Sequence, residues 1–139
     1  MSVRFGAIEL GGTKCVAAVG GADGRIVAET RVPTTSVAAT LGALVSFFEV
    51  QRGAVGPIEA VGIGSFGPLD LDPGSPRHGW ITTTPKPGWA DTDVAGWFRD
   101  ALGVPVALDT DVNAAALGEW RHGAARGAGV VVYITVGTG

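Results

Sequence analysis

The chain has 139 residues, of which 46% are apolar, and a formal net charge of −3. The length and apolar content suffice for one domain with a hydrophobic core. The acidic net charge and the lack of a Lys/Arg cluster argue against nucleic-acid or anionic-membrane partners. No apolar run approaches the roughly 20 residues of a membrane-spanning helix, no signal-peptide pattern is present, and the single Cys15 excludes an internal disulfide. We expect a soluble, cytoplasmic protein.

The first part of the chain predicts a β-meander. Apolar segments at residues 3–8, 15–19 and 25–32 have strand character, and glycine-rich turns at 11–12 and 20–24 separate them. Short apolar runs bounded by such turns are typical of consecutive antiparallel strands.

The rest of the chain alternates between helical and strand patterns. The expected elements are a helix over 37–50 capped by Ser36, a strand over 60–63, a helix capped by 91–93 and ending near 102, a strand over 105–108, a helix over 112–122 opened by Asp111, and a strand over 130–136. Residues 65–87 lack a regular pattern, which usually indicates function or mobility. Trp97 and Phe98 are both expected to face the core. The order predicts an α/β fold with a mixed sheet flanked by helices.

The stretch AIELGGTKCVAAVG (residues 7–20) places two glycines between strand-like segments. A glycine pair lets backbone N–H groups approach an anion closely, because no Cβ intervenes. Thr13 adds a hydroxyl, Lys14 a positive charge, and Glu9 a carboxylate that could hold Mg²⁺ directly or through water. The stretch predicts either a phosphate-binding hairpin or an ordinary turn. It is not a P-loop, since the order Gly-Lys-Thr/Ser is missing and a strand follows in place of a helix.

The stretch GIGSFGPLD (residues 62–70) has the spacing G-x-G-x-x-G at Gly62, Gly64 and Gly67. A dinucleotide-binding fingerprint must open a helix, but Pro68 follows here, so we reject a Rossmann site. The stretch instead predicts a strand end that leads into a tight loop, a usual place for ligands in α/β folds. A purely structural loop is the alternative.

The stretch TTTPKPGWADTD (residues 82–93) combines prolines with Lys86 and Trp89. Prolines fix a loop before binding and so lower the cost of ordering it. Trp89 could stack on the apolar face of a sugar, or it could fill the core beneath a proline-rich connection.

The stretch ALDTDVNAAALGEW (residues 107–120) puts Asp109, Asp111 and Asn113 at a strand-to-helix junction. Asp111 is suited to be the helix N-cap. It is equally suited to act as a base at the carboxyl edge of the sheet, where the helix dipole favours a negative charge. The final TVGTG (residues 135–139) predicts either a second phosphate turn or a simple turn.

These five stretches, in this order along the whole chain, resemble the ROK family of sugar kinases (repressors, open reading frames, kinases), and most of all its fructokinase branch. ELGGTK and YITVGTG match its two phosphate motifs, GIGSFGPLD its sugar-side loop, and DTDVNAAALGE its catalytic junction, while TPKPGW is typical of fructokinases. The resemblance implies an actin-like, ribonuclease-H-like ATPase fold in two lobes, in agreement with the βββαβα order. Because the chain stops within a Gly-Thr-Gly turn, we expect residues 1–125 to be the N-terminal lobe and 126–139 to begin the C-terminal lobe.

The resemblance also implies roles for individual residues in the ATP-dependent phosphorylation of a hexose, foremost of fructose to fructose 6-phosphate. Asp111 would deprotonate the primary hydroxyl of the sugar for in-line attack on the γ-phosphate, and Glu9 would help to place Mg²⁺. The phosphates would contact Gly11, Gly12, Thr13, Lys14, Gly137, Thr138 and Gly139. The sugar would contact Gly64, Ser65, Phe66, Gly67, Pro68, Lys86, Pro87, Gly88, Trp89, Thr110 and Asn113.

The chain departs from the family pattern in two respects. Many relatives that phosphorylate glucose have Asn before the catalytic Asp, whereas this chain has Thr110, which favours the fructokinase branch over a glucokinase. Glucose, mannose or another hexose is the alternative substrate. The structural zinc site of the family, its adenosine pocket and further sugar contacts lie in the C-terminal lobe, and none of their residues is in this sequence. We therefore expect an inactive lobe with exposed apolar surface, and a homodimer for the complete protein.

Two other functions compete with a kinase. A repressor of the same family would carry a helix-turn-helix ahead of the hairpin, but only eight residues precede Glu9 and the net charge is acidic. A non-catalytic sugar-binding fragment would be expected to lose motif residues, whereas all those sought in this half of the family pattern are present.

Overall fold

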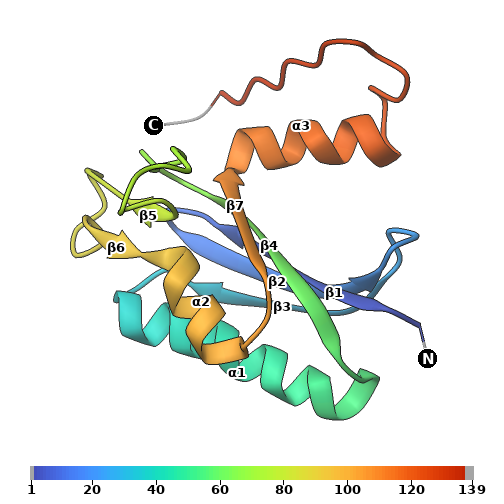
Figure 1. Ribbon diagram of the computed structural model, residues 1–139, viewed down its shortest axis with the longest axis horizontal. Helices are drawn as coiled ribbons and strands as arrows, with labels where there is room; N and C mark the ends of the chain where they lie inside the picture. The colour runs from blue at the N-terminus through green and yellow to red at the C-terminus, as the bar shows by residue number, and fades with distance from the viewer. Residues whose placement is uncertain (1, 137–139) are drawn as a thin grey trace.

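Five strands form one mixed sheet, in the order β3-β2-β1-β4-β7 (Figure 1). The computed structural model describes residues 2–136. The strands are β1 (Arg4–Leu10), β2 (Lys14–Gly21), β3 (Ile26–Pro33), β4 (Ile58–Ser65) and β7 (Val106–Thr110). The first three form an antiparallel meander, while β4 runs parallel to β1 and β7 runs parallel to β4. The predicted meander and mixed sheet are therefore confirmed.

Helices cover the two faces of this sheet unequally (Figure 1). On one face lie α1 (Val37–Val55), which is capped by Ser36 as predicted and is longer than expected, and α2 (Val94–Leu102). On the other face, α3 (Asp111–His122) lies over β4 and β7. None of these helices in the described part of the chain has the length and hydropathy of a membrane span.

The core lies between the sheet and the pair α1 and α2. Alternation along the strands turns Ile8 and Leu10 of β1 and Cys15, Ala17 and Val19 of β2 inward. The helices contribute the buried side chains of Leu41, Leu44, Phe48, Val94, Phe98 and Leu102. Since burial of a large apolar side chain contributes about 1.5–3 kcal/mol, this layer holds the strands in place.

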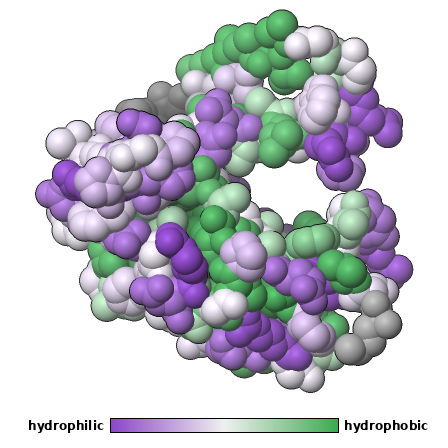
Figure 2. All heavy atoms as spheres, in the orientation of Figure 1, coloured by the Kyte–Doolittle hydropathy of each residue, from purple (hydrophilic) through white to green (hydrophobic). Residues whose placement is uncertain are grey.

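The opposite face of the sheet is open beneath α3. No residue of α3, which is described in full, is buried. A cavity of about 540 Å³ separates the helix from the sheet, and Figure 2 shows an opening between them. The helix exposes the large apolar side chains of Leu117 and Trp120, which are 59% and 43% exposed and agree with the expected exposed apolar surface.

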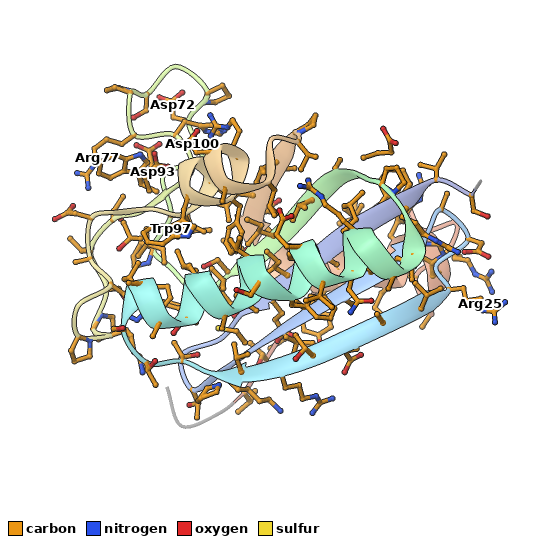
Figure 3. The ribbon with its side chains drawn as sticks, turned by 90° about the horizontal axis from the view of Figure 1, so that it is seen from below. Arg25, Asp72, Arg77, Asp93, Trp97 and Asp100 are labelled. Atoms are coloured by element: carbon orange, nitrogen blue, oxygen red, sulfur yellow. The ribbon has the colours of Figure 1, made fainter. Side chains whose placement is uncertain are left out.

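The long connection between β4 and α2 is not wholly irregular, contrary to the prediction for residues 65–87. In this connection, β5 (Trp80–Ile81) pairs with β6 (Thr92–Asp93) in a small antiparallel ribbon. Of the two strands, β5 falls within residues 65–87 and β6 follows them. Strands of two residues are too short for an alternating pattern to reveal. Asp93, labelled in Figure 3, then caps α2 by accepting a hydrogen bond from the Gly96 N–H at 2.9 Å, as the sequence predicts.

The strand predicted over residues 130–136 is wrong. The segment runs back along α3 (Figure 1) and pairs with no strand among the described residues. Val130, Ile134 and Val136 are 84%, 78% and 93% exposed. An apolar β-branched run has strand propensity, but a strand forms only where a neighbour completes its backbone hydrogen bonds.

The prediction that Trp97 faces the core is also wrong. Trp97 is 38% exposed, whereas its neighbour Phe98 is fully buried. Successive helical residues are rotated by about 100° from each other, so two adjacent side chains cannot both point into the middle of the core.

This pair yields a prediction about stability. Phe98→Ala should lower the free energy of unfolding by about 3–5 kcal/mol, because it leaves a cavity among buried side chains. Trp97→Ala should cost about 1 kcal/mol or less, since its side chain is on the surface. Urea unfolding followed by circular dichroism measures both, and equal losses would contradict the placement of these two residues.

Candidate active site

A tight hairpin joins β1 to β2 at Gly11, Gly12 and Thr13. The Gly11 N–H donates to the Lys14 carbonyl at 3.1 Å, which closes the turn. A Cβ at Gly11 would lie 2.5 Å from that carbonyl oxygen, so the turn has room only for glycine there. Gly12 and Thr13 are exposed at the tip, and a Cβ at Gly12 would meet nothing within 4 Å. The tip presents unshielded backbone, as anion-binding turns require.

Asp111 lies at the junction where β7 ends and α3 begins. Its side chain is half-buried, and its Oδ1 accepts a hydrogen bond from the Val112 N–H at 2.9 Å. The N-cap is Thr110, whose Oγ1 accepts from the Asn113 N–H at 3.1 Å, so the predicted capping role of Asp111 is wrong. Both residue types cap helices well, and only the point at which the backbone turns decides between them. Asp111 instead occupies the first turn, where the helix dipole favours a negative charge.

One pocket of about 880 Å³ brings the predicted motifs together. It is bordered by the hairpin tip, the loop after β4, the proline-rich loop, Asp111 and the last described residues. The lining residues are Gly12, Thr13, Phe66, Gly67, Thr84, Pro85, Lys86, Pro87, Asp111, Thr135 and Val136. Because a glycine turn with exposed backbone, a lysine and a carboxylate border one space, the pocket has room for an anionic ligand beside a group that can accept a proton.

Nearly the whole chain matches a protein family. The family model described as ROK family matches residues 5–139. This chain belongs to the ROK family.

Relatives of this ROK chain include a fructokinase of Zymomonas mobilis, 49% identical over 136 residues that make up 97% of the chain and 45% of the relative. The structure of a ROK hexokinase from Thermus thermophilus has a TM-score of 0.76 and 35% identity, over 90% of this chain and 41% of that one. A ROK family glucokinase from Streptomyces griseus, solved with glucose and AMPPNP, has a TM-score of 0.69 and 29% identity, over 89% and 38%.

These neighbours confirm the predicted actin-like ATPase fold, with this chain as part of the N-terminal lobe. The chain spans about 45% of the length of the fructokinases that it matches.

Trp89 of this ROK chain lies in the core and not in the pocket. It is 0% exposed, and its Nε1–H donates to the Thr35 carbonyl at 2.9 Å. Its ring meets Phe66 edge-on, with centroids 5.5 Å apart. The predicted stacking of Trp89 on a sugar is therefore contradicted, because the ring is inaccessible. The alternative, a tryptophan that fills the core beneath the proline-rich connection, is the one observed, and through it Trp89 supports Phe66 at the pocket.

Gly64 and Ser65 also support the site without lining the pocket. Ser65 is fully buried, and its hydroxyl donates to the Phe66 carbonyl at 2.7 Å. A Cβ at Gly64 would lie 2.8 Å from the Cβ of Ala114 and 3.4 Å from the Cα of Asp111. Glycine at this position lets the start of α3 approach β4 closely, which sets the place of Asp111.

The remaining predicted residues either lie outside the pocket lining or lie outside the described residues. Asn113 turns away from the pocket, since its Nδ2 donates to Asp109 Oδ1 at 2.9 Å. Outside the pocket lining are also Gly11, Lys14, Pro68, Gly88 and Thr110. Gly137, Thr138 and Gly139 lie outside the described residues.

Glu9, the predicted metal ligand, is exposed on β1 next to the hairpin. The strand register pairs Glu9 with Gly64 and Gly64 with Asp109, so the two carboxylates occupy one row of the sheet with only a glycine between them. Within residues 2–136, no group of three His, Cys, Asp or Glu side chains is arranged to hold a metal ion by itself. A cation here would need water or a ligand to complete its coordination.

Four lining residues were not selected from the sequence. Thr84 and Pro85 lie within the proline-rich stretch that was singled out, so their neighbours were the signal. Thr135 and Val136 come from the segment that was predicted to be a strand. The same two residues open the TVGTG stretch, which was singled out from the sequence as a candidate phosphate turn, so here too their neighbours were the signal.

The two hairpin glycines yield a matched test of this geometry. Gly11→Ala should destabilise the protein by about 1–3 kcal/mol, since the new Cβ collides with backbone that cannot move aside. Gly12→Ala should leave the melting temperature nearly unchanged, because its Cβ enters open space. Differential scanning calorimetry measures both, and a Gly11→Ala variant as stable as Gly12→Ala would contradict the turn described here.

Proposed function

We propose that the complete protein containing this chain transfers the γ-phosphoryl group of ATP to a hexose, with fructose as the preferred substrate. The observation that carries this proposal is the pocket in which Asp111 shares one space with the hairpin tip at Gly12 and Thr13. The fructokinase relatives support the same reaction. The proposal concerns the whole protein, of which residues 1–125 would form the N-terminal lobe and 126–139 the start of the C-terminal lobe.

Asp111 would act as the general base. Its carboxylate would take the proton of the primary hydroxyl while that oxygen attacks the γ-phosphorus in line. The bond between the γ-phosphorus and the bridging oxygen would break and release ADP, and the proton would pass from Asp111 to solvent. The half-buried position at the start of α3 suits this role, because it combines access to the pocket with a favourable helix dipole.

The hairpin tip would hold the phosphates. Backbone N–H groups of Gly12 and Thr13 and the Thr13 hydroxyl can donate to phosphate oxygens, and Lys86 brings a positive charge to the same pocket. Phosphoryl transfer needs little covalent help from the protein, since positioning and charge neutralisation supply most of the acceleration.

Magnesium fits the residues beside the hairpin. Glu9 and Asp109 flank Gly64 in one row of the sheet, and carboxylates are preferred ligands of Mg²⁺, which commonly keeps several waters. When bound, the ion would offset the charge of the phosphates. Zinc does not fit the described residues, because Cys15 is the single cysteine of the chain and no cluster of ligating side chains is present among them.

The preference for fructose rests on two features of the sequence. The TPKPGW stretch supplies Pro85, Lys86 and Pro87 to the pocket, and it is the stretch that resembles fructokinases. Thr110 stands where glucose-phosphorylating relatives often have Asn. The same resemblance supports a homodimer in the cytoplasm as the working form of the complete protein.

The reaction can be tested directly with the complete protein. ADP release, coupled to NADH oxidation, should be dependent on Mg²⁺ and ATP and should be fastest with fructose in a panel that includes mannose and glucose. Product analysis by NMR should show phosphate on the 6-hydroxyl. A faster rate with another hexose would correct the substrate, and no turnover with any hexose would refute the kinase.

The role of Asp111 can be tested by substitution. Asp111→Asn in the complete protein should lower kcat by about 10²–10⁴-fold, because the amide cannot accept the proton. Affinity for AMPPNP should change little. Asp100→Asn, on α2 and outside the pocket lining (Figure 3), serves as the control and should retain wild-type kcat. Near-normal turnover by Asp111→Asn would remove this residue from the role of base.

A further inference from the structure

Thr34 connects the hairpin to the proline-rich loop. It directly follows β3 and is 7% exposed. Its N–H donates to the Thr13 carbonyl at 2.9 Å, and its Oγ1 donates to the Gly11 carbonyl at 2.7 Å. Its own carbonyl accepts a hydrogen bond from Lys86 Nζ at 3.3 Å. Three polar groups of one buried residue thus hold two parts of the pocket that are far apart in the sequence.

The hydroxyl of Thr34 has a directional effect on the hairpin. The Gly11–Gly12 peptide is trans, so its C=O and N–H groups point in opposite directions. Because Thr34 holds the Gly11 carbonyl on its own side, the Gly12 N–H must point away from Thr34. Gly12 lines the pocket and is exposed. The N–H that could meet a phosphate is therefore oriented by a hydrogen bond on the far side of the same peptide.

The buried side chain of Cys15 contacts the Thr34 hydroxyl from the core. Its Sγ lies 3.2 Å from Thr34 Oγ1. A hydroxyl carries one hydrogen, and Thr34 gives that hydrogen to Gly11, so its oxygen can accept from the thiol, whose sulfur also lies 3.9 Å from the Gly11 carbonyl oxygen. Burial raises the pKa of the Cys15 thiol, which keeps the hydrogen on sulfur. The Thr34 hydroxyl is thereby held in the orientation in which it donates to the hairpin.

We propose that Thr34 is a positioning residue that orients the Gly12 N–H toward the phosphates of the nucleotide, acting through the Gly11 carbonyl. The inference rests on the proposed kinase function and adds to it a residue that does not touch the ligand. Glycine peptides rotate readily. Without the Thr34 hydroxyl, this peptide can turn its carbonyl toward the pocket, where an oxygen repels phosphate. The loss should therefore fall on nucleotide binding and leave sugar binding unaffected.

The test compares four forms of the complete protein: the wild type, Thr34→Val, Thr34→Ser and Thr40→Val. Valine keeps the shape of threonine and removes the donor, while serine keeps the donor. Thr40 is the matched control, since it is 1% exposed and its hydroxyl accepts from the Thr35 N–H at 2.9 Å away from the hairpin. Calorimetry gives the Kd of AMPPNP and of fructose for each form, and thermal unfolding gives its stability.

Thr34→Val should weaken AMPPNP binding by about 10- to 100-fold, the loss expected for one hydrogen bond to a charged group. Fructose binding should be unchanged, and Thr34→Ser should restore the affinity for AMPPNP. Thr40→Val should lose about as much stability as Thr34→Val, but it should keep the wild-type affinity for AMPPNP. If Thr34→Val does not fold, Thr34→Ala replaces it, because alanine also lacks the donor, and the same loss of AMPPNP affinity is expected.

Two results would overturn the inference. One is an affinity of Thr34→Val for AMPPNP equal to that of Thr40→Val, and the other is an equal loss of AMPPNP and fructose binding, which indicates a general structural effect. Both results differ from a failure of the proposed kinase function. If the kinase proposal failed, the wild-type protein itself would neither bind AMPPNP nor phosphorylate any hexose.

Discussion

The backbones of β1, β4 and β7 run in the same direction, so their carboxyl ends meet at one edge of the sheet. The register places Leu10, Ser65 and Thr110 in a single row at this edge. The three segments that leave it are the glycine hairpin, the loop after β4 and the start of α3. They are distant in the sequence and adjacent in space because parallel strands must all end on the same side. The hairpin tip and Asp111, on which the proposed catalysis rests, are brought together by this alignment.

Small residues and buried hydrogen bonds turn this edge into a pocket of defined shape. Gly64 lets α3 approach β4, and Gly11 lets the hairpin close on itself. Thr34 and Trp89 then attach the hairpin and the proline-rich loop to the region where β3 leads into α1. Because these contacts are buried, they do not block the entry of a ligand into the pocket. The exposed residues of the pocket, such as Gly12 and Thr13, are therefore free to contact a ligand.

Three of the predictions that failed did so because a local pattern was compatible with two environments. Asp111 and Thr110 are both good capping residues, and the backbone turn selected Thr110. Trp89 could have met a sugar or the core, and the packing of Phe66 against it selected the core. The apolar run at 130–136 had strand character, but no neighbouring strand among the described residues pairs with it. For Trp89 the deciding partner, Phe66, lies elsewhere in the chain, whereas the cap was decided by the local turn of the backbone.

The sequence by itself determined the meander, the alternation of strands and helices, the glycine hairpin and the carboxylate at the strand-to-helix junction. These are properties of short segments, and they follow from side-chain periodicity and from the conformations that glycine and capping residues allow. Only the tertiary structure decided which of these residues share the pocket and which support it from beneath. Those roles depend on the register of the parallel strands and on contacts such as that between Thr34 and Gly11, which link residues far apart in the chain.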